Sequence, residues 1–209
     1  MSKIGIYSGS FDPIHVGHVE FALAAKKECG LDKVVFLPEA NPREKVEVSD
    51  IRLRSLMIGL GVEAYPGLEL LYLNQDRFSV SLTLPRLYEQ FPGAELVLLL
   101  GSDLVRTFSY RWEGLGELLA TMELAVGLRM GDSAEEISHT IEAVAHDYGV
   151  KARYKIIKSP REHLASTQVR SGTHYIDDVN PKVAEYIKAQ GLYDSDSSAV
   201  AGASSLANE

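Results

Sequence analysis

The sequence is short of cysteine and of long apolar runs, and both shortages exclude classes of protein. Of the 209 residues only Cys29 is a cysteine, so no intramolecular disulfide can form and nothing indicates secretion. No run reaches the roughly 18 consecutive apolar residues that a membrane-spanning helix requires, and the N-terminus carries no signal-peptide core. We therefore expect a cytoplasmic protein that has no membrane partner.

Positive charge is scarce as well. Lysine and arginine number 21 against 29 aspartates and glutamates, and the formal net charge is -8. An acidic chain has no general field that attracts nucleic acid, so we expect no nucleic-acid partner. A polyanionic ligand therefore needs a local cationic site.

Apolar side chains are abundant enough for one buried core. Hydrophobic residues make up 45% of the chain, and we expect a single domain over 1–193. The tail 194–209 lacks the large apolar groups that offset the entropy of chain ordering, so we expect it to be disordered.

Short apolar runs alternate with segments of helical periodicity along the chain. Uninterrupted apolar strands are typical of a buried parallel sheet, so the pattern predicts an α/β fold with a doubly wound, mostly parallel sheet and helices on both faces. The run "AELVLLLGSD" (94–103) is the most apolar and is expected at the sheet centre. The expected strands are 3–8, 33–38, 68–73, 94–103, 122–129 and 151–157, and the expected helices are 16–30, 48–61, 79–91, 133–149, 166–173 and 180–193.

The segment "GSFDPIHVGH" (9–18) follows the first expected strand and enters a helix. In a doubly wound sheet, ligands bind beyond the carboxyl ends of strands, and a helix N-terminus favours anions. Gly9 allows the backbone to approach a ligand, and Gly17 leaves the first helical turn bare. His15 and His18 project to the same side, so we predict a polyphosphate pocket in which they bind developing charge. Two histidines without a third ligand give a weak zinc signal, and we expect no resident metal.

A second polar segment, "LASTQVRSG" (164–172), lies near the other end of the chain. The hydroxyls of Ser166 and Thr167 at a helix start are suited to phosphate oxygens, and Arg170 offers a planar cationic fork to a pyrophosphate. Alone, this pattern is typical of a capped surface helix, but its pairing with the first segment favours a phosphate site.

Both segments resemble signatures of the nucleotidylyltransferase superfamily. The first resembles G-[TS]-F-D-P-x-H-x-G-H, and the second resembles I-S-S-T-x-[IV]-R with Ala165 in place of its first serine. The resemblance implies a Rossmann-like nucleotidylyltransferase fold, ATP as a substrate and Mg²⁺ bound with it. It implies that the triphosphate is contacted by Gly9, Ser10, Phe11, His15, Gly17 and His18, and the leaving pyrophosphate by Ser166, Thr167 and Arg170.

Further segments resemble the bacterial nicotinate mononucleotide adenylyltransferases. These are "FPGAELVLLLGSDL" (91–104), the lone tryptophan and the C-terminal "VAEYIKAQGLY" (183–193). The loop 39–54 departs from that family, because "PREK" stands where P-P-H-K is usual and Ile51-Arg52 replaces a His-Arg pair. The resemblance implies an acceptor-nucleotide site formed by Arg43, Lys45, Ser79, Thr83, Gly101, Asp103 and Trp112.

The implied reaction is adenylyl transfer from ATP to nicotinate mononucleotide, giving deamido-NAD and pyrophosphate. The acceptor phosphate is already anionic, so positioning and electrostatic stabilisation suffice without a general base. Nicotinamide mononucleotide or another phosphorylated acceptor stays open, as does a non-catalytic nucleotide-binding sensor. A nucleotide hydrolase is disfavoured because no base or carboxylate cluster is evident for positioning water. Homo-oligomer formation also stays open.

Overall fold

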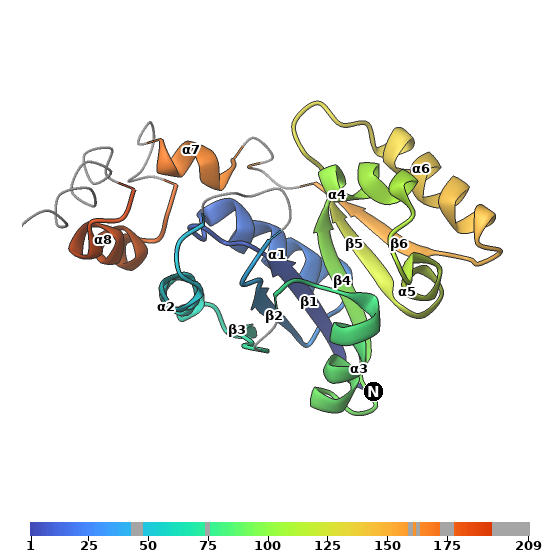
Figure 1. Cartoon of the computed structure of the whole chain (residues 1–209), viewed down its shortest axis with the longest axis horizontal. Helices are drawn as coiled ribbons and strands as arrows, with labels where there is room; N and C mark the ends of the chain where they lie inside the picture. The colour runs from blue at the N-terminus through green and yellow to red at the C-terminus, as the bar shows by residue number, and fades with distance from the viewer. Residues whose placement is uncertain (43–47, 74–75, 159–160, 162–163, 172–177, 194–209) are drawn as a thin grey trace, which may run out of the picture.

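Six parallel strands form one sheet in the computed structural model, in the order β3-β2-β1-β4-β5-β6 (Figure 1). The order reverses between β1 and β4, so the carboxyl ends of these two strands flank the crevice in which such sheets bind ligands. The strands are β1 (Lys3–Gly9), β2 (Lys33–Pro38), β3 (Leu68–Leu70), β4 (Glu95–Gly101), β5 (Glu123–Gly127) and β6 (Arg153–Ile157).

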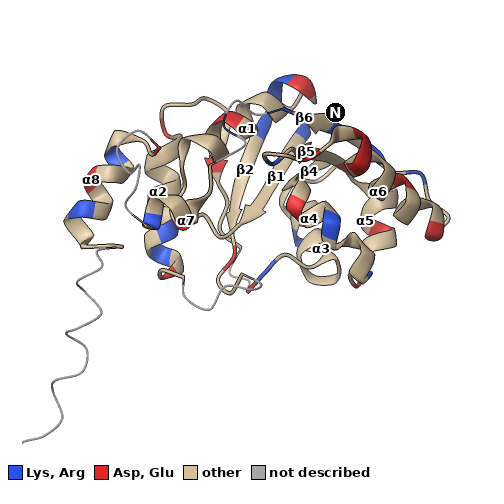
Figure 2. Cartoon of the chain, turned by 90° about the horizontal axis from the view of Figure 1, so that it is seen from above, with Lys and Arg blue, Asp and Glu red and all other residues tan. Residues whose placement is uncertain are grey.

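Helices cover both faces of this sheet, as Figure 2 shows from above. One face is packed by α1, α2 and α8, and the other by α3, α4, α5 and α6. The helical segments are α1 (Val16–Glu28), α2 (Ile51–Val62), α3 (Val80–Gln90), α4 (Ser102–Arg106), the 3-10 turn η1 (Thr107–Tyr110), α5 (Leu115–Thr121), α6 (Ala134–Asp147), α7 (Ser166–Arg170) and α8 (Pro181–Gln190). The structure describes residues 1–42, 48–73, 76–158, 161, 164–171 and 178–193.

Two apolar cores lie on opposite faces of the sheet, because successive side chains of a strand point in opposite directions. In β4, Leu96, Leu98 and Leu100 enter the core beneath α3 to α6, whereas Val97 and Leu99 enter the core beneath α1, α2 and α8. Every residue from 96 to 100 is buried, which explains the continuous apolar run. The doubly wound parallel fold and the central place of this strand are therefore confirmed.

Several element boundaries differ from the sequence expectations. The strand expected over 94–103 ends at Gly101, and Ser102 and Asp103 begin α4. The strand expected over 68–73 is limited to Leu68–Leu70, because β3 pairs with β2 over only three residues. The helical segments η1 and α5 were not predicted. The tail 194–209 lies outside the described residues, and within the described residues no helix is long and apolar enough to cross a membrane.

Candidate active site

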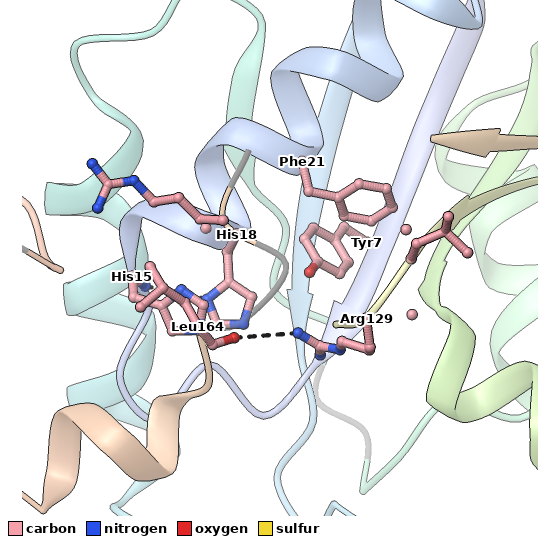
Figure 3. Close-up of a pocket in the computed structure, with 11 residues that line it drawn as sticks. Tyr7, His15, His18, Phe21, Arg129 and Leu164 are labelled. Carbon is pink, nitrogen blue, oxygen red and sulfur yellow. Dashed lines mark hydrogen bonds between the residues drawn. The ribbon is translucent and has the colours of Figure 1, made fainter. Parts of the chain in front are cut away.

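The two histidines of the first segment lie together at the start of α1. His15 is the N-cap residue, with extended backbone angles, and His18 follows in the first turn. Their rings stack, with centroids 3.6 Å apart and planes inclined by 25°. His15 is 3% exposed, and both rings line a pocket beside the carboxyl ends of the sheet (Figure 3). The spacing thus places both rings on one side, as predicted.

The orientation of His18 is set by the backbone of the loop. Its Nδ1 accepts a hydrogen bond from the backbone N–H of His15, at 3.2 Å. A neutral imidazole whose Nδ1 accepts carries its proton on Nε2. His18 therefore presents Nε2–H as a hydrogen-bond donor, and a phosphate oxygen is a suitable acceptor for it.

Aromatic side chains pack beneath the histidines. Phe11 is 1% exposed, and its ring centroid lies 5.2 Å from that of His18 and 5.2 Å from that of Tyr7. Burial raises the pKa of the Tyr7 hydroxyl far above its ordinary value. A Cβ on Gly9 would lie 3.3 Å from the Phe11 ring, so this glycine makes room for the phenyl group.

Gly17 lines the same pocket as the two histidines and lies close to two side chains. A Cβ there would lie 3.1 Å from Nδ1 of His15 and 3.4 Å from Cβ of Leu164. We expected Gly17 to leave the first helical turn bare for a phosphate. In the structure the glycine accommodates the imidazole of His15, which folds back over the turn, and its contact with a phosphate stays a prediction.

The second polar segment contacts the first directly. Ser166 Oγ donates to the carbonyl oxygen of Pro13 at 3.0 Å, and Arg170 Nη1 donates to that of Asp12 at 2.6 Å. Arg170 Nη2 also donates to Thr167 Oγ1 at 3.3 Å. Segments more than 150 residues apart thus form one unit, as the separation of 153 residues between Ser166 and Pro13 illustrates.

Arg54 of α2 holds two loops together, and the sequence analysis missed it. It is fully buried, and its guanidinium donates to four backbone carbonyls, those of Ser10 (2.7 Å), Glu39 (2.8 Å), Ala40 (3.1 Å) and Ser49 (2.7 Å). These bonds tie the loop after β1 to the loop after β2. A detectable signal was present, since position 54 shares a helical face with the buried positions 57, 58, 61 and 62.

Arg52, two positions before Arg54, lies in a different environment. The sequence comparison placed Ile51-Arg52 where the family has a His-Arg pair. In the structure the Arg52 side chain is 84% exposed and pairs with Asp50, the N-cap of α2. The arginine that the structure buries is Arg54, two positions later.

Two further arginines line the pocket with the histidines. Arg129 follows the carboxyl end of β5, and Nη1 donates to the Leu164 carbonyl at 3.3 Å (Figure 3). Its backbone N–H donates to Ser102 Oγ at 2.9 Å, which fixes the chain here. Arg161 lies 3.3 Å from Glu20 and 3.8 Å from Asp178. Because ligands bind beyond the carboxyl ends of the strands, sequence reasoning could have found Arg129, which follows β5. Arg161 lies in a loop, and no sequence pattern marks it as a binding residue.

Comparison with known proteins now identifies the family. A family model described as cytidylyltransferase-like matches residues 6–172. The chain belongs to this family. It is a nucleotidyltransferase.

Named relatives match this nucleotidyltransferase over most of their length. A probable nicotinate-nucleotide adenylyltransferase of Neisseria meningitidis serogroup B is 31% identical over 210 residues, covering 93% of this chain and 100% of the relative. One of Clostridium botulinum is 30% identical over 174 residues, covering 81% and 85%. The nicotinic acid mononucleotide adenylyltransferase of Plasmodium falciparum, solved with NaAD, aligns with a TM-score of 0.73 at 19% identity over 93% of this chain and 98% of that one. This likeness supports the nucleotidyltransferase fold.

The residues expected to bind the acceptor lie at several places in this nucleotidyltransferase. Gly101 lines the histidine pocket at the end of β4. Asp103 lies in the first turn of α4, and its Oδ1 is 3.4 Å from Nε of Arg129. Trp112 packs edge-on against Phe108, with ring centroids 5.0 Å apart. Arg43 and Lys45 lie outside the described residues.

The two hydroxyl residues expected to bind the acceptor, Ser79 and Thr83, lie at the start of α3. Ser79 is the N-cap residue, and its hydroxyl lies 3.0 Å from that of Ser81. Thr83 is fully buried, and its Oγ1 accepts from the backbone N–H of Ser79 at 2.9 Å. In this conformation the Thr83 hydroxyl lies at the helix start, and its contact with a ligand, like that of Ser79, stays a prediction.

Proposed function

We propose that this nucleotidyltransferase transfers the adenylyl group of ATP to nicotinate mononucleotide, giving deamido-NAD and pyrophosphate. The observation that carries the proposal is the stacked pair of His15 and His18 at the N-terminus of α1, beside the switch point of the sheet. The names of the relatives that match at 31% and 30% identity support nicotinate mononucleotide as the acceptor.

The reaction is an in-line displacement at the α-phosphorus of ATP. An oxygen of the acceptor's 5′-phosphate forms a bond to this phosphorus, and the bond from phosphorus to the bridging oxygen breaks. Pyrophosphate leaves with the electron pair of that bond. The attacking phosphate is an anion at neutral pH, so positioning and charge stabilisation account for catalysis.

The pocket residues take complementary parts in this step. His18 donates from Nε2 to a phosphate oxygen in the pocket. Arg129 and Arg161 bring positive charge to a chain whose net charge is -8. Mg²⁺ enters as part of the ATP substrate, bound to phosphate oxygens. Among the described residues, no group of three or more His, Cys, Asp or Glu is arranged to hold a metal.

The second polar segment supports the leaving group. Arg170 bridges Asp12 and Thr167, and its side chain remains 26% exposed. A guanidinium has five N–H donors, so Arg170 binds the pyrophosphate with an edge that the protein does not use. Ser166, which is 8% exposed and bonded to Pro13, holds the two segments together.

The test is pyrophosphate release from ATP and Mg²⁺ with either nicotinate mononucleotide or nicotinamide mononucleotide. The proposal predicts release with the nicotinate form and little with the amide form. Equal release with both would show that the acceptor site does not select the carboxylate. No release with either, while ATP still binds, would contradict the proposal and favour another acceptor or a sensor. His139→Ala, at an exposed position of α6, is the matched control for variants of the histidine pair.

A further inference from the structure

The carboxylate of Asp12, in the loop between β1 and α1, is not used in the mechanism above, which involves only the backbone carbonyl of this residue. Asp12 is 1% exposed. Its Oδ1 accepts from the hydroxyl of Tyr193 at 2.6 Å, and its Oδ2 accepts from the backbone N–H of Ser49 at 3.2 Å. A buried carboxylate is costly unless hydrogen bonds satisfy it, so both donors are needed to keep Asp12 in place.

The position of Asp12 bears on the groups that contact ATP. Its backbone carbonyl accepts from Arg170 Nη1 at 2.6 Å, and its Oδ2 lies 4.0 Å from the same nitrogen. Asp12 also precedes His15 by only three residues. A shift of Asp12 therefore moves the partner of Arg170 and the loop that ends in the N-cap of α1.

Tyr193 reaches this loop from the end of α8. The helix stops at Gly191, which has a φ of 58°, and the N–H of Leu192 bonds back to the carbonyl of Ile187 at 3.0 Å. Tyr193 has a φ of 66° and lies 181 residues from Asp12 in the sequence. Burial and the hydrogen bond to Asp12 raise the pKa of Tyr193 well above its ordinary value, so its hydroxyl stays a donor.

We propose that Tyr193 is a positioning residue for nucleotide transfer. Its hydroxyl holds the carboxylate of Asp12, and Asp12 in turn orients Arg170 and the His15 end of the loop toward the ATP phosphates. Tyr193 touches no substrate and acts through Asp12. The inference rests on the proposed function, since it assumes that this loop binds ATP.

The test variant is Tyr193→Phe, which keeps the ring and the backbone preference and removes the hydroxyl. We expect kcat/KM for ATP to fall about tenfold, the effect of losing one hydrogen bond to a charged group. The dissociation constant of a non-hydrolysable ATP analogue with Mg²⁺, measured by calorimetry, should rise by a similar factor. KM for the acceptor should stay unchanged.

Two further variants separate positioning from packing. Tyr186→Phe removes a tyrosine hydroxyl from α8, at the edge of the same apolar core, and should leave kcat/KM and analogue binding unchanged. Asp12→Asn removes the charge that Tyr193 holds. In that background, Tyr193→Phe should cause little additional loss, because both changes break one interaction.

The outcomes decide the proposal. It is overturned if Tyr193→Phe lowers only the melting temperature, with analogue affinity and kcat/KM within about twofold of wild type. It is also overturned if Tyr186→Phe causes the same loss, or if the losses of Tyr193→Phe and Asp12→Asn multiply in the double variant. Analogue binding needs no acceptor. A wild-type protein that binds the analogue but releases no pyrophosphate would therefore refute the proposed reaction and still allow this test.

Discussion

Replacing Arg54 by methionine should destabilise the protein severely. Methionine has a similar reach but no donor, so four backbone carbonyls at 2.7–3.1 Å from the guanidinium would lose their partner inside the protein. A hydrogen bond to a charged group contributes about 1.5–3 kcal/mol, but neighbouring bonds are not additive. We therefore expect a loss of about 4 kcal/mol in the free energy of unfolding, close to that of breaking a buried ion pair. For a domain of this size that lowers the melting temperature by roughly 8–16 °C.

Urea unfolding followed by circular dichroism would measure this loss. Arg52→Met is the matched control, because its side chain is 84% exposed and pairs with the nearby Asp50 at the surface, and it should change the free energy far less than Arg54→Met does. Arg54→Lys keeps the charge with three donors and should fall between the two. A loss below about 1 kcal/mol for Arg54→Met would refute the reasoning, since water would then satisfy the carbonyls.

Three other predictions concern the site and its supports. His18→Ala should lower the turnover number for pyrophosphate release about 10²-fold, as loss of one oxyanion donor does, and a turnover within about threefold of wild type would remove His18 from the mechanism. Gly17→Ala places a Cβ 3.1 Å from Nδ1 of His15, so the displaced imidazole should reduce turnover at least about tenfold; wild-type turnover would contradict this packing. Hydrogen bonds from the side chain and the backbone N–H of Arg52 lower the pKa of Asp50 from 3.8 to about 2. The advantage of wild type over Asp50→Ala in urea unfolding should therefore be constant above about pH 4 and shrink as the pH falls toward 2, whereas a constant advantage at all pH values would contradict it.

The sheet was predictable because a strand that is buried on both faces has apolar residues at successive positions. Residues 96 to 100 of β4 all enter one core or the other, so the strand reads as an uninterrupted apolar run. Its end was harder to place. Ser102 is fully buried and α4 begins there without a proline, so the strand pattern continued two residues too far.

The histidine pair was predictable for a similar local reason. A spacing of three residues at a helix start places His15 and His18 on one face, and their rings do stack. The close packing of Gly17 against His15 was not evident, because it depends on the ring of His15 folding back over the first turn.

The supports of the site depend on contacts between distant segments. Arg54 binds Ser10, which is 44 residues away, and Tyr193 binds Asp12, which is 181 residues away. Neither pairing follows from spacing or periodicity. The apolar face of α2 signalled that Arg54 is buried, but only the fold shows which carbonyls it satisfies.

The central claim is the transfer of an adenylyl group to nicotinate mononucleotide. The most direct measurement uses ATP labelled in its α-phosphate, incubated with the full chain, Mg²⁺ and this acceptor, followed by separation of the products. The account predicts that the label moves into deamido-NAD in step with pyrophosphate release, and that His18→Ala abolishes most of this transfer while His139→Ala does not. Label recovered in AMP, or left in ATP that remains bound, would contradict the account and indicate hydrolysis or nucleotide sensing.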